Sequence, residues 1–335
     1  MTDNFPMKQY DYITLSKALG IILVVVGHFT STVYMPAYYV EMKELIFSFH
    51  MPLFMVLSGF LFQMSLCRRP GKIFLIPFLK KKFLRLMVPY FFLSVVIALL
   101  NFILGHYISV KRTVDVRYLF EILYTNVGGS AVFLWFMYTL FVVFLISALC
   151  MRMKGGITLL GILSIVLYFV PLPELFYLSY VHSFLIYFWG GMILFLLTDR
   201  GKLHLSFVHA LAAMFLLGLA YSAREWFSTE YIRQSLNLLC GLSGSYLVIC
   251  IAYAFGQGEN KWLLSLGKYS AYIYLLHMAG VYVVRIIYEK IGLFTPLTYG
   301  VALFTAVVAG LIIPILLTKY VIHKNKSLTF LMGEK

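Results

Sequence analysis

The sequence predicts an all-α, polytopic integral membrane protein with about ten transmembrane helices and both termini in the cytoplasm. Of its 335 residues, 62% are hydrophobic and 12% are charged, and the mean hydropathy is +0.90. A soluble domain is nearer half apolar and a quarter charged. Two further observations support the prediction. The apolar residues form runs long enough to span a bilayer, and Lys and Arg gather in alternate connecting segments.

Ten apolar runs of roughly 20 residues are expected to be membrane spans within one domain, 1–335. In chain order they cover approximately 14–34, 45–66, 86–106, 131–150, 156–172, 181–198, 205–223, 235–256, 269–288 and 297–318. An even number of spans places both termini on the same side of the membrane. The longest connections, about 67–85 and 107–130, are too short for an independent soluble core.

The distribution of Lys and Arg selects the cytoplasm as the side of the termini. With this orientation the cytoplasmic segments hold Lys8, Arg68, Arg69, Lys72, Lys80, Lys81, Lys82, Arg85, Arg152, Lys154, Arg200, Lys202, Lys261, Lys268, Lys319, Lys324, Lys326 and Lys335. The outer segments hold only Lys43, Lys111, Arg112, Arg117, Arg224, Arg233 and Lys290. Because basic residues accumulate in cytoplasmic loops, we attribute the net charge of +14 to topology rather than to nucleic-acid binding.

The first predicted span carries a cation near its start and an imidazole further along, Lys17 and His28, in an otherwise apolar run. If the run is helical, the step of eleven residues is close to three turns. The two side chains then lie on one face, roughly 16 Å apart along the helix axis. Ionisable groups at such depth are costly and indicate a functional site.

Three histidines, His28, His50 and His277, fall within predicted spans. His28 lies about six residues before the outer end of the first span, and His50 about five residues after the outer start of the second. On antiparallel neighbours these depths nearly match, so the rings can face each other. A single intramembrane histidine is equally well explained by a ring that bonds a carbonyl or a tyrosine hydroxyl. Three at similar depth favour a shared cavity.

The acidic residues follow a different pattern. All thirteen lie in predicted loops, termini or span edges. A proton-coupled or sodium-coupled carrier usually has an acid within its spans, so this pattern counts against a transporter. It also leaves His28 without a carboxylate partner inside the membrane, unless Asp11, Glu121 or Glu174 reaches in.

A basic segment, Lys80-Lys81-Lys82-Phe83-Leu84-Arg85, precedes the third span. It is explained either as a cytoplasmic anchor for that helix or as a cradle for an anion. Arginine can bind phosphate bidentately, and lysine binds it as a point charge. With Lys17 at the same membrane face, a phosphorylated cytoplasmic cosubstrate is a reasonable hypothesis. The chain has no Walker or Rossmann glycine pattern.

These stretches, in this order, resemble the membrane-bound acyltransferase family 3, and most of all its fucose 4-O-acetylase-like branch of bacterial polysaccharide O-acetyltransferases. The matching features are Lys17 with His28, Phe49-His50-Met51-Pro52-Leu53-Phe54 with Ser58-Gly59-Phe60, the basic run into Arg85 and Pro89, Leu134-Trp135-Phe136, and Leu266-Gly267 to His277. The resemblance covers about residues 10 to 280. The family commonly has Arg where Lys17 stands and often Asp where Thr14 stands, and lysine lacks the bidentate fork of arginine.

The resemblance implies a multi-pass O-acyltransferase of the bacterial cytoplasmic (inner) membrane. It would move an acetyl or other acyl group from cytoplasmic acyl-CoA, such as acetyl-CoA, to a hydroxyl of a surface polysaccharide or its lipid-linked precursor. His28 would be the catalytic base, and His50 or His277 would orient it or steady the oxyanion. The CoA phosphates would lie against Lys17, Lys81, Lys82 and Arg85. No metal is implied. Two alternatives stay open: a transporter or flippase of a lipid-linked saccharide, and a non-catalytic partner in a polysaccharide assembly complex.

Overall fold

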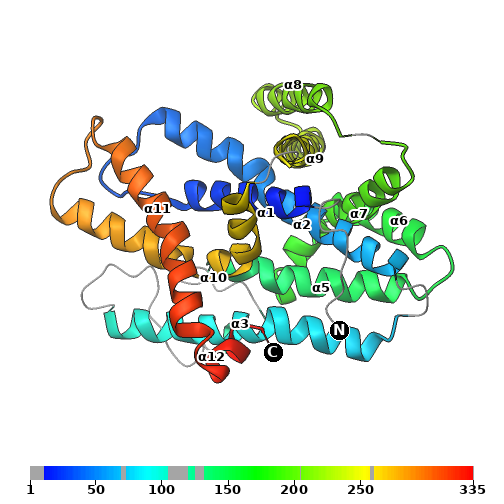
Figure 1. Ribbon diagram of the computed structural model, residues 1–335. Coiled ribbons are helices and arrows are strands. Elements are labelled where there is room, and N and C mark those ends of the chain that lie inside the picture. The colour runs from blue at the N-terminus through cyan, green and yellow to red at the C-terminus, as the bar shows by residue number, and fades with distance from the viewer. Residues whose placement is uncertain are drawn as a thin grey trace. The chain divides into compact units, whose positions relative to one another are not determined.

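The computed structural model describes residues 11–68, 73–104, 120–124, 132–203, 205–256 and 260–334. In these residues there is no strand, and the chain is helical throughout its regular parts (Figure 1). The longer helices are α1 (Asp11–His28), α2 (Ala37–Arg68), α3 (Leu75–Leu104), α5 (Trp135–Cys150), α6 (Gly156–Tyr168), α7 (Leu178–Asp199), α8 (Phe207–Ala223), α9 (Glu230–Phe255), α10 (Lys261–Lys290) and α11 (Tyr299–Leu317). The short ones are η2 (Val132–Leu134), η3 (Leu175–Tyr177), the π-helix η4 (Thr318–Ile322) and α12 (Lys326–Leu331).

The helices confirm the prediction of an all-α, polytopic membrane protein. Within the described residues, seven helices are long and apolar enough to cross a membrane, and α5, α6 and α8 are shorter apolar helices. Each predicted span overlaps one of them. Parts of the predicted pattern lie outside the described residues, namely the end of the span 86–106, the start of 131–150, most of 107–130, and the cations Lys8, Arg69, Lys72, Lys111, Arg112, Arg117 and Lys335.

The helix boundaries near the first connection differ from the predicted ones. α1 ends at His28 rather than at residue 34, and α2 begins at Ala37 rather than at residue 45. The hydroxyl of Ser31 accepts hydrogen bonds from the backbone N–H groups of Val33 (3.1 Å) and Tyr34 (3.4 Å). Such a serine turn offers the backbone an alternative to the helix. His28 is therefore the last residue of its helix and not a residue within it.

The start of α10 also differs, because the helix begins at Lys261 rather than at residue 269. The side chain of Asn260 accepts a hydrogen bond from the backbone N–H of Leu263 (3.3 Å). This is an N-cap, which satisfies one of the donors that a helix start leaves open. The cap lies before the apolar run, so hydropathy alone places the start too late.

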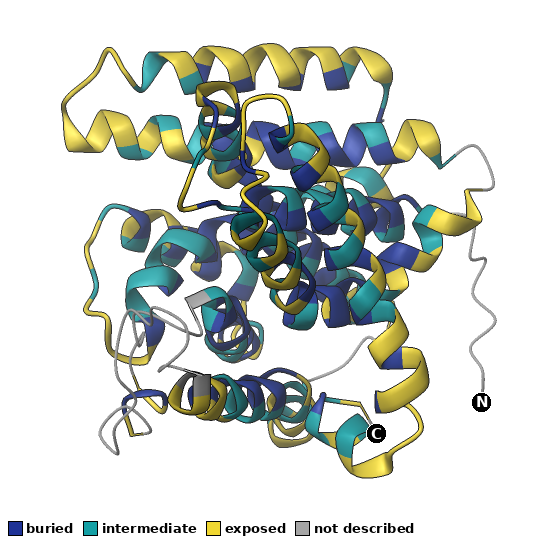
Figure 2. Ribbon diagram, turned by 90° about the vertical axis from the view of Figure 1, so that its left-hand side faces the viewer, coloured by how far each residue is buried: buried dark blue, intermediate teal, exposed yellow. Residues whose placement is uncertain are grey.

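The chain forms two compact units, and each unit consists of two separate stretches of the sequence. Met1–Leu61 and Ile193–Tyr320 form the first, and Phe62–Met192 and Val321–Lys335 form the second. In the first unit, α1 packs against α9, α10 and α11, and α8 packs against α9. α8 lies uppermost in Figure 2 and is largely exposed, with apolar side chains such as Phe207, Val208 and Phe215 that suit contact with lipid.

α1 is held by its neighbours at glycines, where backbones approach closely. A Cβ atom added at Gly267 of α10 would lie 2.1 Å from the carbonyl oxygen of Thr14 in α1. One added at Gly310 of α11 would lie 2.6 Å from a methyl group of Val25 in α1. Small residues at such positions let transmembrane helices pack by van der Waals contact. The position of α1 is therefore set by close contacts along its length.

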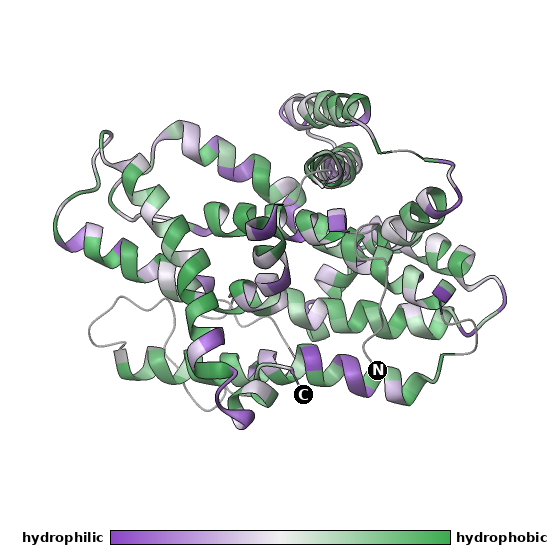
Figure 3. Cartoon of the chain, in the orientation of Figure 1, coloured by the Kyte–Doolittle hydropathy of each residue, from purple (hydrophilic) through white to green (hydrophobic). Residues whose placement is uncertain are grey.

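The second unit is built on α3 and α5, which pack against each other, with α6 against α5 and α12 against α3. Aromatic side chains fill its interior: the ring of Phe62 lies 5.7 Å from Phe78, 5.9 Å from Phe144 and 5.6 Å from Phe188, between ring centroids. The basic segment of α3 is the hydrophilic, purple interruption of this otherwise apolar helix in Figure 3.

A methyl group at Gly267 tests the close packing of α1 and α10. Because the added Cβ of Gly267→Ala meets backbone rather than a flexible side chain, the helices must separate. Overpacking of this kind costs about 1–3 kcal/mol. We expect a lower midpoint of thermal unfolding for the purified protein in detergent. Gly218→Ala in α8 is the control, since nothing lies within 4 Å of its added Cβ. Equal midpoints for both variants would contradict the close packing.

Candidate active site

The rings of His28, His50 and His277 lie together in the first unit. The ring centroids of His28 and His277 are 5.0 Å apart, and those of His28 and His50 are 6.2 Å apart, both pairs nearly perpendicular. The three residues come from α1, α2 and α10. The structure thus brings together the three histidines that the sequence predicts at similar depth, with His28 common to both close pairs.

Each of the three rings bonds the backbone of its own helix through Nδ1. The acceptors are the carbonyl of Val24 for His28 (2.7 Å), of Ile46 for His50 (2.9 Å) and of Tyr274 for His277 (2.8 Å). Because a carbonyl oxygen can only accept, these bonds place the proton on Nδ1. In the neutral ring, Nε2 then carries the lone pair. All three imidazoles, when neutral, therefore present an Nε2 atom that can accept a hydrogen bond.

The three rings differ in exposure. His50 is 5% exposed and His277 is fully buried, whereas His28 is half-buried. The ring of Phe47 lies beside two of them, with its centroid 5.6 Å from that of His28 and 4.8 Å from that of His50. Phe47 is itself 41% exposed. Access from outside the protein therefore favours His28 as the reacting ring, with His50 and His277 behind it.

The end of α1 that carries His28 is fixed by a buried tyrosine. The hydroxyl of Tyr39 in α2 shares its single proton between the carbonyls of Val26 (2.7 Å) and Phe29 (2.5 Å). The last carbonyls of a helix lack intrahelical partners, and Tyr39 supplies one for them. Its ring is fully buried and lies 5.3 Å from that of Tyr299. Tyr39 therefore holds the backbone two residues before His28 and at the residue that follows it.

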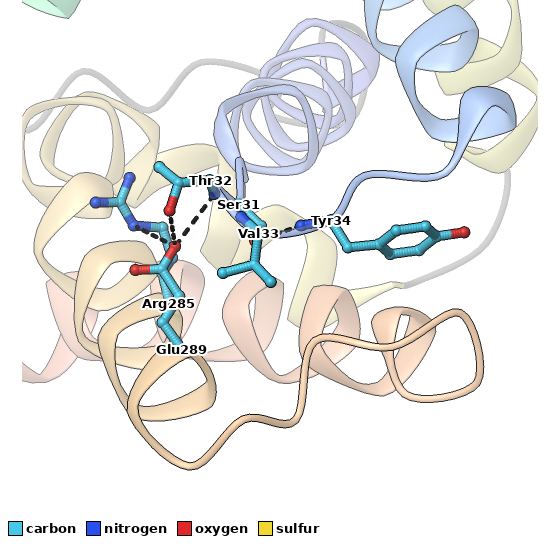
Figure 4. Close-up of polar contacts among 6 residues, drawn as sticks. All are labelled: Ser31, Thr32, Val33, Tyr34, Arg285 and Glu289. Atoms are coloured by element: carbon cyan, nitrogen blue, oxygen red, sulfur yellow. Dashed lines mark hydrogen bonds and ion pairs between the residues drawn. The ribbon is translucent and has the colours of Figure 1, made fainter.

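The connection after His28 is also tied to α10. The carboxylate of Glu289 accepts hydrogen bonds from the backbone N–H (3.2 Å) and the hydroxyl (3.0 Å) of Thr32, and the Nε atom of Arg285 lies 3.7 Å from the same oxygen. Figure 4 shows Glu289 between Arg285 and Thr32. Arg285, Glu289 and Tyr39 are not among the residues that the sequence pattern singles out. Arg285 could have been found from the sequence, because it is a cation within the predicted span 269–288 and a charge at such a position indicates a functional site.

The structure supplies a backbone partner where the sequence left a carboxylate partner open. Asp11 begins α1, roughly 25 Å along the helix axis from His28. Glu121 and Glu174 belong to the second unit. The Nδ1 bond to Val24 already orients the His28 ring, so no acid is needed for that purpose. Within the described residues, no set of three or more His, Cys, Asp or Glu side chains is arranged to hold a metal ion.

The predicted donor-binding cations divide between the two units. Lys17 lies on α1 and is half-buried, whereas Lys81, Lys82 and Arg85 lie on α3 in the second unit. Lys81 and Arg85 are one helical turn apart and exposed. Lys82 turns inward, with its ammonium 3.5 Å from the ring centroid of Phe144 and 5.5 Å from that of Phe78. Its contacts are those of a cation packed on aromatic faces.

Comparison with known families decides the class of protein. A family model described as an acyltransferase domain matches residues 10–319. The chain belongs to the membrane-bound acyltransferase family 3. The match includes the three histidines and the four predicted donor-binding cations. Membership of this family makes the protein a membrane acyltransferase and favours an enzyme over a transporter or a non-catalytic assembly partner. No curated protein and no solved structure matches the chain.

Removal of the Tyr39 hydroxyl tests how the acyltransferase holds the end of α1. Tyr39→Phe leaves the ring in place but withdraws the donor that the part-buried carbonyl of Val26 and the buried carbonyl of Phe29 share, which costs about 1–3 kcal/mol. We expect a lower unfolding midpoint and a kcat reduced several-fold, with an unchanged KM for the acyl donor. Tyr38→Phe is the control, since Tyr38 is 62% exposed. If both variants retain full activity and stability, Tyr39 does not position His28.

Proposed function

We propose that this acyltransferase transfers an acyl group, most simply acetyl from acetyl-CoA, to a hydroxyl of a bacterial cell-surface polysaccharide or of its lipid-linked precursor. The observation that carries the proposal is the His28 ring, which is half-buried at the end of α1 and donates a hydrogen bond from Nδ1 to the carbonyl of Val24. A histidine held in this tautomer offers a positioned base at Nε2. The family supplies the reaction class, and the basic segment of α3 supports a phosphorylated donor.

The proposed reaction begins when Nε2 of His28 takes the proton of the acceptor hydroxyl. The oxygen attacks the thioester carbonyl and a tetrahedral oxyanion forms. When the oxyanion collapses, the carbon–sulfur bond breaks, and the imidazolium of His28 returns its proton to the departing CoA thiolate. The products are the acyl ester and free CoA, and His28 is neutral again. Throughout, the Val24 carbonyl accepts from Nδ1 and is better paired while the ring is charged, as in charge-assisted hydrogen bonds.

His50 and His277 fit the role of hydrogen-bond acceptors better than that of hydrogen-bond donors to an oxyanion. Their Nδ1–H groups donate hydrogen bonds to the carbonyls of Ile46 and Tyr274. A neutral ring with this tautomer has no proton at Nε2, so it can give none to an oxyanion. We therefore propose that their lone pairs accept hydrogen bonds from other hydroxyl groups of the acceptor, since the reacting hydroxyl donates its single proton to His28.

On the donor side we propose that Lys81 and Arg85 meet the CoA phosphates. Both are exposed on the same face of α3, and an Arg beside a Lys suits phosphate binding. Lys82 is assigned to packing against Phe144 instead. Lys17 stays a candidate on α1, roughly 16 Å along the axis from His28. With the termini in the cytoplasm, as the charge distribution favours, the donor enters at the Lys17 end of α1 and the acceptor at the His28 end.

Replacement of His28 tests the assignment of the base. We expect His28→Ala to abolish transfer of radiolabelled acetyl from acetyl-CoA to polysaccharide in membranes, while expression and the unfolding midpoint stay near those of the parent protein. General-base catalysis contributes about 10²–10⁴-fold to the rate, so the transfer rate should fall by at least about 10²-fold. His323→Ala, which removes a 38% exposed histidine outside the cluster, is the control. Near-normal acetylation by His28→Ala would refute the assignment.

The donor site is tested by neutralising Arg85. We expect Arg85→Gln to raise the KM for acetyl-CoA about tenfold, because a hydrogen bond to a charged group is lost, and to leave kcat little changed. The effect should shrink for the shorter donor acetyl-pantetheine, which lacks the adenosine phosphates. Lys202→Gln, an exposed cation elsewhere on the predicted cytoplasmic side, is the control. Equal losses with both donors would place Arg85 outside the phosphate site.

A further inference from the structure

A lysine stands one aromatic ring away from the histidine cluster. The ammonium of Lys43 lies 5.3 Å from the ring centroid of Phe47, one helical turn further along α2. The same ring lies 5.6 Å from His28 and 4.8 Å from His50, between centroids. One face of α2 therefore carries Lys43, Phe47 and His50 in succession. The ring of His28 contacts this face at Phe47.

Lys43 makes no close ion pair in the part of the chain that the structure describes. It is half-buried, and no carboxylate oxygen there lies within 4.0 Å of its ammonium. Its neighbours in sequence, Glu41 and Glu44, are exposed, and the charge of Glu44 acts on Lys43 without forming an ion pair within 4.0 Å. Glu289, the acid tied to the connection after His28, is committed to Thr32. A partly desolvated cation without a close ion pair is a candidate for binding an anion.

A structural role is the alternative to ligand binding. A lysine near a membrane surface can extend its charged end toward water while its stem covers an apolar ring. Lys290, the exposed last residue of α10, is a lysine of this ordinary kind on the same predicted side of the membrane. Lys43 differs from it because its ammonium lies over a ring that contacts two of the three histidines.

The charge of Lys43 has a consequence for the proposed reaction. His28 becomes an imidazolium when it takes the proton of the acceptor hydroxyl, and a nearby ammonium without a close ion pair opposes that charge. An anion bound to Lys43 cancels the opposition. Binding of an anionic acceptor would then stabilise the charged transition state more than the resting enzyme, which is the condition for a contribution to rate.

We propose that Lys43 binds an oxyanion of the acceptor, a phosphate or a carboxylate, and so holds the acceptor hydroxyl at His28. The inference rests on the proposed function, since it takes the acceptor to be the substrate that reaches the His28 end of α1. The oxyanion has two sources, the phosphate of a lipid carrier or the carboxylate of an acidic sugar. Both offer the same charged oxygens to the ammonium.

Binding of paired probes to the purified protein tests the proposal without relying on transfer. Farnesyl phosphate is compared with farnesol, and methyl β-glucuronide with methyl β-glucoside. We expect at least one anionic probe to bind the parent protein about tenfold more tightly than its neutral counterpart. This preference should vanish in Lys43→Gln, survive in Lys43→Arg and be unchanged in Lys290→Gln. A preference for the phosphate alone assigns the lipid carrier, and one for the glucuronide alone assigns the sugar.

The outcomes that overturn the proposal are no preference for either anionic probe, or a preference that Lys43→Gln leaves intact. Acetyl transfer to surface polysaccharide in cells provides a second measurement. There Lys43→Gln should lose about tenfold in acetyl content, Lys43→Arg should restore most of it, and Lys290→Gln should match the parent. If His28→Ala abolishes transfer but Lys43→Gln behaves like the parent, the proposed function stands and this inference fails. If the anion preference depends on Lys43 but His28→Ala still transfers acetyl, the proposed base fails instead.

Discussion

The hydrogen bond from Nδ1 of His28 to the carbonyl of Val24 is the interaction on which the proposed chemistry depends. It fixes the ring to its own helix, it assigns the proton to one nitrogen, and it leaves the other as a base. In the Ser-His-Asp triad a carboxylate orients the histidine in this way. In a bilayer, a buried carboxylate is costly, and a backbone carbonyl orients the ring without adding a charge. His50 and His277 use the same device, so each ring, when neutral, carries its lone pair at Nε2.

The rest of the first unit serves to keep that ring in place. Close backbone contacts at Gly267 and Gly310 set α1 against α10 and α11. Tyr39 satisfies the carbonyls at the end of α1, and Glu289 holds Thr32 four residues further on. These contacts come from three other helices, so the position of His28 is determined by the fold rather than by local sequence. A base for acyl transfer requires such positioning.

The sequence predicts the helices well because apolar runs have the length that a bilayer requires, and each predicted span overlaps a helix. It places the end of α1 poorly because the turn at Ser31 depends on side-chain to backbone bonds that hydropathy does not measure. The histidine cluster was predictable from depth along the spans. The partner of His28 was not, since it is a backbone carbonyl, which every residue carries. The contact of Lys82 with the ring of Phe144 depends on the packing of α3 against α5.

The protonation of the His28 ring tests the account most directly. Solid-state NMR of the protein in lipid, with ¹⁵N-labelled histidine and His28→Gln to assign the signal, distinguishes the two ring nitrogens by their chemical shifts. We predict a neutral ring at neutral pH with the proton on Nδ1 and a bare Nε2. The opposite tautomer, with the proton on Nε2, would contradict the bond to Val24 and remove the base from the proposed reaction.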